Sequence, residues 1–290
     1  MVEFWSLGGL SLWELLRRTA RETWEDSVFG QGGRMAFYQF LAIFPWLLVL
    51  LTLAQRVPHA GGSLRHLIQD LSVQVLPSQG AQLFADMVDE LTGRAVSGFR
   101  FVVICGGALW AGCNATWAMM YGLNRAYEVE ERRSRWRLGI TIVGLTLSLA
   151  LTGCIALFLI FAATHVEPRI HSESALFRGM EWLVLILSLS FSFALLYRFA
   201  PNLRDPEWRW STPGALCALV LWLGATFAAR FFFGRVDDYS STFGHLNAVA
   251  MLLLWLYVTN GAILIGGEMN SEIQKAAVPS AGPPQRSGPC

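Results

Sequence analysis

Charged residues are scarce in this sequence. Asp, Glu, Lys and Arg make up 15% of its 290 residues, against roughly 25% in an average soluble domain. That deficit excludes an ordinary soluble domain for most of the chain. The hydrophobic share of 54%, with 12 Trp and 19 Phe, indicates an integral membrane protein instead. The net charge of +1 gives no indication of nucleic-acid binding.

Cysteine is also rare, and the common catalytic motifs are absent. Four of the five Cys lie inside apolar stretches and the fifth is Cys290, which fits neither a disulfide scaffold nor a prenylation signal. The five His are scattered, without HExxH, metal-spaced Cys/His, GxSxG or P-loop patterns. We therefore expect no catalytic residues, no metal site, no cofactor and no enzymatic activity. The first residues also lack the pattern of a signal peptide, so none is expected.

The longest uncharged stretch lies near the end of the chain. Between Asp238 and Glu268 are 29 residues without Asp, Glu, Lys or Arg, and a helix needs only about 20 to cross a bilayer. Asn247, Tyr257 and Asn260 interrupt this stretch. Polar groups at membrane depth are costly unless other helices or a wet cavity face them. We therefore interpret the stretch as an inner helix of a bundle.

Five further apolar stretches complete the predicted fold, an all-α, polytopic membrane helix bundle. We predict an N-terminal cytoplasmic or interfacial segment (1–34), a transmembrane domain (35–275) and a disordered cytoplasmic tail rich in Pro, Gly and Ser (276–290). Pro45 should kink the first span or free a carbonyl. Small residues recur every four positions in the second, which favours close helix packing. The predicted spans are 35–55, 101–124, 138–164, 182–197, 210–229 and 245–267.

Two segments outside the spans are predicted to be helical. Residues 11–29 place Trp13 and Trp24 on the apolar side of an amphipathic helix, which the GQGG run at 30–33 should end. It is either an interfacial helix along the lipid headgroups or a helix packed on the bundle. Residues 57–98 carry two apolar helical stripes separated by Pro77. They predict a two-helix extracytoplasmic cap, either packed on the bundle or forming a lid over an entrance.

The distribution of Lys and Arg predicts the orientation. With the N-terminus inside, the inner segments hold 14 Lys and Arg and the outer segments hold 8. Short cytoplasmic loops carry the excess of positive charge in membrane proteins, and the loop 125–137 alone holds 5. Both termini are therefore predicted to be cytoplasmic.

On this topology three groups of polar residues are candidates for a site. The first, at the cytoplasmic ends of the spans, is either a set of snorkelling helix-end anchors or a polar vestibule for an ion, a substrate or a lipid headgroup. The second lies inside the membrane. The third, at the outer face, is either a gate or a cap on the loop between the last two spans. The cytoplasmic group contains Tyr38, Gln39, Asn124, Arg125, Arg198, Glu268 and Asn270. The intramembrane group contains Asn114, Asn247, Tyr257 and Asn260, and the outer group contains Asp237, Asp238, Tyr239 and His245.

Several stretches resemble the YihY/BrkB membrane family, once labelled ribonuclease BN. They are MAFYQFLAIFPWLLVL (35–50), YGLNRAYEVEERRSRWR (121–137), LYRFAPN (196–202), TPGALCALVLWLGATFAARFFF (212–233) and WLYVTNGAILIGGEMN (255–270). They follow one another in the family's order over roughly residues 10–275. The resemblance implies a bacterial inner-membrane protein with six transmembrane helices, of a family described as transporters or as envelope and serum-resistance factors.

Three functions remain open from the sequence. The first is a transporter, channel or lipid translocator. The second is an envelope scaffold or assembly factor without a transported substrate. The third is a membrane enzyme, for which Glu268 is the one inner carboxylate to nominate; ribonuclease activity is not expected. The expected partners are membrane lipids and a second copy or an envelope protein, with no nucleic acid; the sequence names no substrate.

Overall fold

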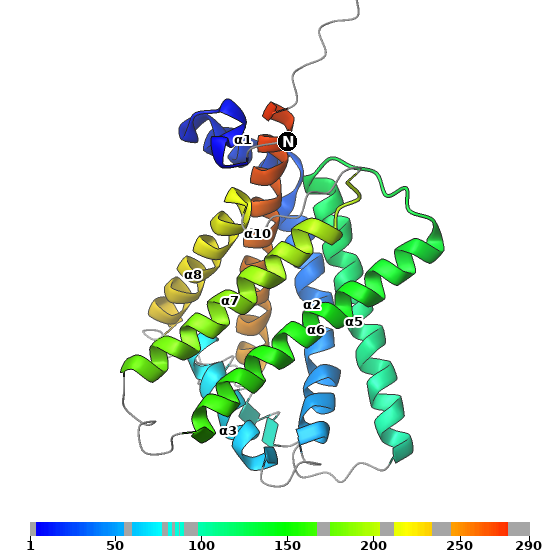
Figure 1. The fold of residues 1–290 in the computed structure, drawn as a ribbon, viewed down its shortest axis with the longest axis vertical. Coiled ribbons are helices and arrows are strands. Elements are labelled where there is room, and N and C mark those ends of the chain that lie inside the picture. Colours follow the sequence, from blue (N-terminus) through cyan, green and yellow to red (C-terminus); the bar gives the residue numbers. More distant parts are fainter. Residues whose placement is uncertain are drawn as a thin grey trace, which may run out of the picture.

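The structure is a computed structural model, which describes residues 4–54, 60–76, 81–82, 85–86, 88–89, 98–166, 175–203, 212–233 and 245–277. Within these residues all regular structure is helical, so the all-α prediction is confirmed. Figure 1 shows long helices running between two ends of the molecule, with α1 (Leu12–Glu25) beyond one end and α3 (Ala60–Val75) at the other. A short 3-10 helix, η1 (Phe4–Gly9), precedes α1.

Six long helices form the bundle. Five of them are long and apolar enough to cross a membrane, and each extends beyond its predicted span because polar residues continue the helix outside the apolar part. The sixth, α8, has a shorter described apolar stretch, Pro213–Ala229. The six are α2 (Val28–Ala54), α5 (Gly98–Ala126), α6 (Arg135–Val166), α7 (Ala175–Phe199), α8 (Pro213–Phe233) and α10 (His245–Ala277).

The helix break expected at the GQGG run does not occur there. The chain turns instead at Ser27, which has a positive φ of 53°, and α2 runs unbroken through Gly30–Gly33 and Pro45. Gly32 faces α10, where a Cβ atom would lie 3.4 Å from the carbonyl oxygen of Tyr257. This glycine therefore serves close helix packing, which outweighs its low helix propensity.

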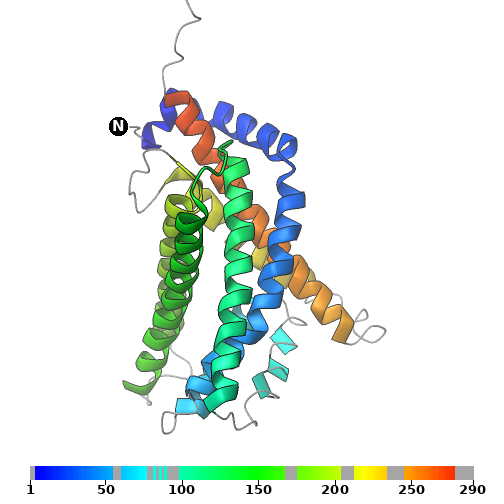
Figure 2. The ribbon, with the colours of Figure 1, turned by 90° about the vertical axis from the view of Figure 1, so that its right-hand side faces the viewer.

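The helices α2, α5 and α10 pack against one another at the centre of the bundle, and Figure 2 shows α2 and α10 crossing. The buried face of α5 consists largely of small residues, as the sequence predicts. At Gly112 a Cβ atom would lie only 2.7 Å from Nε1 of Trp46 on α2. Small residues are what allow such close approach between membrane helices.

Helix α1 contacts the bundle through one face and leaves another uncovered. Leu15 is buried against Met269 and Ile273 of α10, whereas Trp13 and Trp24 are 77% and 79% exposed. The helix therefore packs on the bundle and still presents two Trp side chains outward, as an interfacial helix would. Gly8 of η1 also lies against the last turn of α10 at Ile273 and Ala276.

Helix α3 packs onto the opposite end of the bundle. Leu67 and Leu71 contact Ile160 of α6, and Ile68 lies with Val88 against Leu47 and Leu51 of α2. This is the packing that the first apolar stripe of the cap predicts. Most of the second stripe lies outside the described residues, as do the residues of the tail from 278 onward.

Candidate functional site

The residues expected at the cytoplasmic vestibule belong to several separate contacts. Gln39 pairs with Asn260 of the intramembrane group: its Nε2 donates to Oδ1 of Asn260 at 3.0 Å, and Nδ2 of Asn260 donates to its Oε1 at 2.8 Å. Asn260 also donates to the carbonyl of Leu256 and is fully buried. The pair joins α2 to α10, and both amide hydrogens of Asn260 already have acceptors. Its geometry is therefore explained by a structural role.

Asn124 lies in a second network, which ties the loop after α5 to the end of α7. Its Nδ2 donates to Glu131 at 3.0 Å, and its Oδ1 accepts from the backbone N–H of Asn202 at 2.8 Å. Arg133 donates to the carbonyls of Phe199, Ala200 and Pro201. These are carbonyls that the end of a helix leaves without partners, so the basic loop caps α7.

Asn270 holds the start of α8. Its Oδ1 accepts from the backbone N–H of Gly214 at 3.0 Å, and its Nδ2 donates to Oγ1 of Thr212 at 2.9 Å. The Thr212 hydroxyl in turn accepts from the N–H of Ala215 at 3.1 Å, which is an N-cap contact. Asn270 therefore has a structural task at the junction of α8 and α10.

The remaining candidates are dispersed. Tyr38 packs between α2 and α5 beside Ala111 and Ala115, and Asn114 bonds the carbonyl of Trp110 within its own helix. Tyr257 lies against Phe29 and lines a cavity of about 510 Å³ between α8 and α10. Arg198 lies 5.6 Å from the ring of Phe199. The residues Asp237, Asp238 and Tyr239 and the side chains of His245 and Asn247 lie outside the described part.

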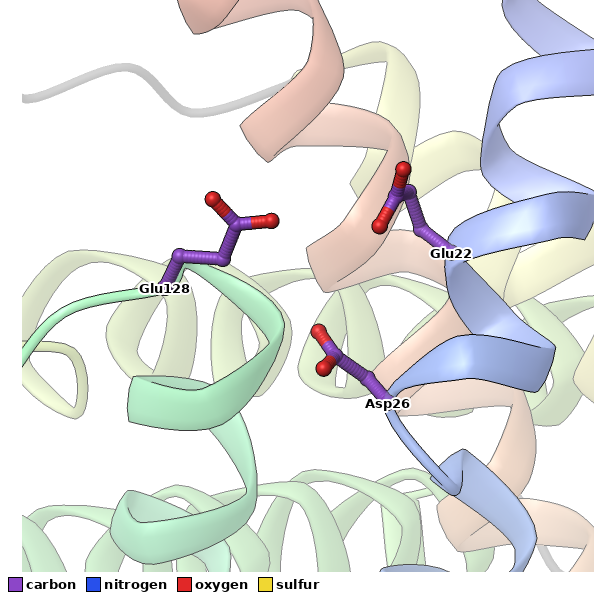
Figure 3. Close-up of side chains that lie close together, drawn as sticks. All are labelled: Glu22, Asp26 and Glu128. Carbon is purple, nitrogen blue, oxygen red and sulfur yellow. The ribbon is translucent and has the colours of Figure 1, made fainter.

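Three carboxylates from three separate places in the chain converge where α1, α2 and α5 meet. Glu22 comes from α1, Asp26 from the turn before α2 and Glu128 from the turn after α5 (Figure 3). One oxygen of each lies within 4.8 Å of the others, a spacing that a metal ion could bridge. We call Glu22, Asp26 and Glu128 the carboxylate cluster. The sequence analysis missed it because Glu128 follows Glu22 and Asp26 by more than 100 residues in the chain.

Charges around the carboxylate cluster set its electrostatics. Burial raises the pKa of the Asp26 carboxyl above its ordinary value; the charge of Arg125 acts against this shift and that of Glu128 adds to it. Burial likewise raises the pKa of Glu22, with Lys275 opposing the shift. Arg125 donates from Nε to the backbone carbonyl of Asp26 at 3.1 Å and lies 3.7 Å from its carboxylate. Partial burial thus disfavours the charged form of both carboxylates.

One face of α10 adjoins the carboxylate cluster. Lys275 donates to Glu128 at 2.9 Å and to Glu272 at 2.7 Å. Glu268 lies one turn below Glu272, is 1% exposed, and neither of its carboxylate oxygens has a hydrogen-bond partner in the described structure. Among the described residues, Glu268 thus makes no hydrogen bond to Arg125 or Arg198, the two arginines of the predicted vestibule. The charges that act on Glu268 are those of Asp26, Lys275, Glu22 and Glu128.

A separate apolar cavity of about 580 Å³ lies within the bundle, between α2, α3, α5, α6 and α10. Its few polar groups are mostly paired: the hydroxyls of Thr116 and Thr146 bond each other at 2.7 Å, and Ser72 donates to the carbonyl of Gln69. Its size is that of ordinary ligand pockets, which span roughly 300–1,000 Å³. The wall is therefore suited to hydrocarbon and offers little to a hydrated ion.

The apolar cavity reaches the outer surface of the bundle at α6. Gly153 and Cys154 of α6 line it and are both exposed, on a helix that is long and apolar enough to span a membrane. The opening of the cavity therefore lies on the outer side of α6. Trp255 contributes to the wall, but its indole Nε1 is buried away from the open space and has no hydrogen-bond partner among the described residues.

Comparison with known proteins gives one family. The sequence profile of the family described as Virulence factor BrkB matches residues 19–289. YfkH of Bacillus subtilis (strain 168), named a ribonuclease-like protein, is 28% identical over 254 residues, covering 84% of this chain and 90% of YfkH. No solved structure matches the chain.

Two UPF0761 membrane proteins are also similar to the chain. That of Verminephrobacter eiseniae (strain EF01-2) is 26% identical over 271 residues, covering 90% of this chain and 63% of the relative. That of Alkalilimnicola ehrlichii (strain ATCC BAA-1101 / DSM 17681 / MLHE-1) is 22% identical over 262 residues, covering 87% and 56%. The chain thus spans nearly all of YfkH but less than two thirds of these two proteins.

Proposed function

Because this chain belongs to the virulence factor BrkB family and is a multi-span α-helical membrane protein, we propose that it is a translocator of lipid or of another hydrophobic solute. Its place is the bacterial inner membrane, with both termini in the cytoplasm. The observation that carries this proposal is the apolar cavity of about 580 Å³, with its opening at Gly153 and Cys154.

The chemistry of the cavity favours a lipid over an ion or a polar solute. A hydrated ion would need several polar ligands in place of its water, whereas the cavity wall supplies almost only hydrocarbon. An acyl chain matches such a wall. A lipid can also enter sideways through the opening on α6 without passing through water.

The arrangement of the ends supports six crossings rather than five. Gly8 lies against Ile273 and Ala276 at the end of α10, so the chain returns to the side from which α2 departs. An even number of crossings is needed for that return. Adding α8 to the five long apolar helices gives six, in agreement with the sequence prediction.

The experiment is lipid transfer between leaflets in proteoliposomes, followed with fluorescent phospholipid and with the purified full chain. The test variant is Gly153→Leu, because a side chain at Gly153 meets nothing within 4 Å and would project at the mouth of the cavity. We expect the transfer rate to fall at least severalfold, because the leucine occupies the space that the lipid needs.

Gly144→Leu is the matched control. Gly144 lies on the same helix, is exposed, also has open space around it, and faces away from Gly153, since nine residues turn a helix by half a circle. It should leave transfer unchanged. No transfer by folded wild-type protein would reject the translocator and favour the envelope scaffold. An equal fall in the transfer rate of both variants would show that lipid transfer does not use the cavity.

A further inference from the structure

The carboxylate cluster and the adjoining face of α10 hold more negative than positive charge. Five carboxylates lie there, those of Glu22, Asp26, Glu128, Glu268 and Glu272. Among the described residues three cationic side chains form ion pairs with them: Lys275 with Glu128 and Glu272, Arg125 with Asp26 at 3.7 Å, and Arg21 with Glu22. Arg21 is 3.7 Å from Glu22 but bonds Glu25 more closely, at 3.0 Å. The cluster is thus left with uncompensated carboxylates.

Burial makes this imbalance costly. Oδ2 of Asp26 and both carboxylate oxygens of Glu268 are buried without a hydrogen-bond partner in the described structure. An ionised carboxylate removed from water without a partner is among the most unfavourable groups that a protein can contain. A proton or a bound cation would remove this cost, and three such oxygens within one region are more than one proton can serve.

Glu268 is directed into this region by its place on α10. Residues four and seven positions apart share one helix face, so Glu268, Glu272 and Lys275 point the same way. Lys275 bonds Glu128 of the cluster directly, and the largest charge effect on Glu268 comes from Asp26. The unpartnered carboxylate of Glu268, 1% exposed, therefore lies on the face of α10 that is turned toward the carboxylate cluster.

The spacing of the carboxylate oxygens limits the size of the ion that they can bind together. Oxygens bound to Ca²⁺ lie 2.3–2.6 Å from it, so two of them are at most about 5 Å apart; for Mg²⁺ at 2.0–2.1 Å the limit is about 4 Å. The oxygens of Glu22, Asp26 and Glu128 lie within 4.8 Å of one another. This upper bound lies inside the limit for Ca²⁺ and above the limit for Mg²⁺, so Ca²⁺ is the ion that every spacing within it accommodates.

We infer that Glu22, Asp26 and Glu128, with Glu268 below them, form a binding site for a Ca²⁺-sized divalent cation. The site joins α1, the turn before α2, the end of α5 and α10, so a bound ion links the N-terminal helix to the bundle. Lys275 lies beside the site as a built-in counter-ion. The inference goes beyond lipid translocation and does not depend on it.

The test is isothermal titration calorimetry of the chelator-treated full chain in detergent, with CaCl₂ and, separately, MgCl₂. We expect one saturable Ca²⁺ site and weaker Mg²⁺ binding. Glu128→Gln should weaken Ca²⁺ binding at least roughly tenfold, as changes within a metal site do. Glu128 is more than half exposed, so this variant should fold normally. Glu268→Gln should produce a similar loss by removing the buried charge.

Glu14→Gln is the matched control, because Glu14 is an exposed carboxylate of α1 bonded to Arg18; its Ca²⁺ affinity should equal that of the wild type. Absence of saturable Ca²⁺ binding by wild-type protein that elutes as a folded species would overturn the inference. So would an equal loss in Glu14→Gln, which would mean diffuse surface binding, or an unchanged affinity in Glu268→Gln. Lipid transfer is not measured, so this result is separate from that of the proposed function.

Discussion

The amide of Asn260 is fully buried in α10, and its contacts explain how a polar residue is tolerated at membrane depth. Both of its N–H groups donate, one to Gln39 and one to the carbonyl of Leu256, and its oxygen accepts from Gln39. Removing one partner leaves a buried polar group without a bond, whereas removing both leaves none. This asymmetry gives a test of the pair.

Gln39→Leu alone should lower the free energy of unfolding by about 1–3 kcal/mol, because it leaves the buried Oδ1 of Asn260 without a donor and one of its N–H groups without an acceptor. Asn260→Leu should cost a similar amount. The double variant should be more stable than the sum of the two losses predicts, as in a double-mutant cycle. Thermal unfolding in detergent measures all three. Strict additivity would show that the two side chains do not act as a pair.

Sequence reasoning identified Asn260, Glu268 and Asn270 as unusual polar residues, but it could not assign their partners. A helix pattern gives depth and face along one helix, whereas the partner of Asn260 is Gln39, 221 residues away. The depth of a residue in the membrane can be predicted from its own segment, whereas its contacts depend on how all the helices pack.

Among the elements, α8 and α10 approach each other most closely at two glycines. A Cβ atom on Gly266 would collide with the carbonyl oxygen of Gly214 and the hydroxyl of Tyr197, and would lie 2.9 Å from Cβ of Ala218. The same Tyr197 hydroxyl donates to the carbonyl of Ile263 at 2.7 Å. The backbone itself is thus the contact surface between these helices.

Gly266→Ala should destabilise the protein by about 1–3 kcal/mol, because the methyl group forces two backbones apart. Gly224→Ala on α8 is the matched control: it meets nothing within 4 Å and should be neutral or stabilising by up to about 1 kcal/mol. Thermal unfolding of both variants in the same detergent decides. If Gly266→Ala unfolds no more easily than Gly224→Ala, the close crossing is not present.

The basic loop 125–137 shows a second limit of sequence reasoning at this scale. The sequence analysis interprets its arginines, apart from the vestibule candidate Arg125, as a topology signal. Arg133, however, donates to three backbone carbonyls at the end of α7, a task that needs the planar fork of arginine. Composition predicts where a charge lies relative to the membrane, but not which helix end it caps.

For the whole molecule, the number of crossings decides on which side each loop lies. Asp70 of α3 follows one crossing, Ser134 follows two, and Gln274 near the end of α10 follows all of them. If α8 crosses, Ser134 and Gln274 lie on the same side; if it does not, they lie on opposite sides. The fold class and most spans could be predicted, because each span is a continuous run of apolar residues whose length can be counted in the sequence.

Single cysteines at these positions, in a background with the five native cysteines replaced, provide the measurement. A membrane-impermeant maleimide added to inside-out vesicles should label Ser134→Cys and Gln274→Cys but not Asp70→Cys. Intact cells should show the reverse. Labelling of Ser134→Cys and Gln274→Cys from opposite sides would reject six crossings. Both Ser134 and Asp70 are exposed, so neither side chain is hidden by protein.

Lys275 lies where the first helix, the end of α5 and the last helix meet, and it is the only lysine in these 290 residues. Reductive methylation with ¹³C-formaldehyde would therefore place an NMR-visible dimethylamine at one side chain of the fold, with its charge retained. Its chemical shift would report on the junction of three segments without any engineered label. The protein thus offers one lysine side chain as a spectroscopic probe, and this side chain bonds the carboxylates of Glu128 and Glu272.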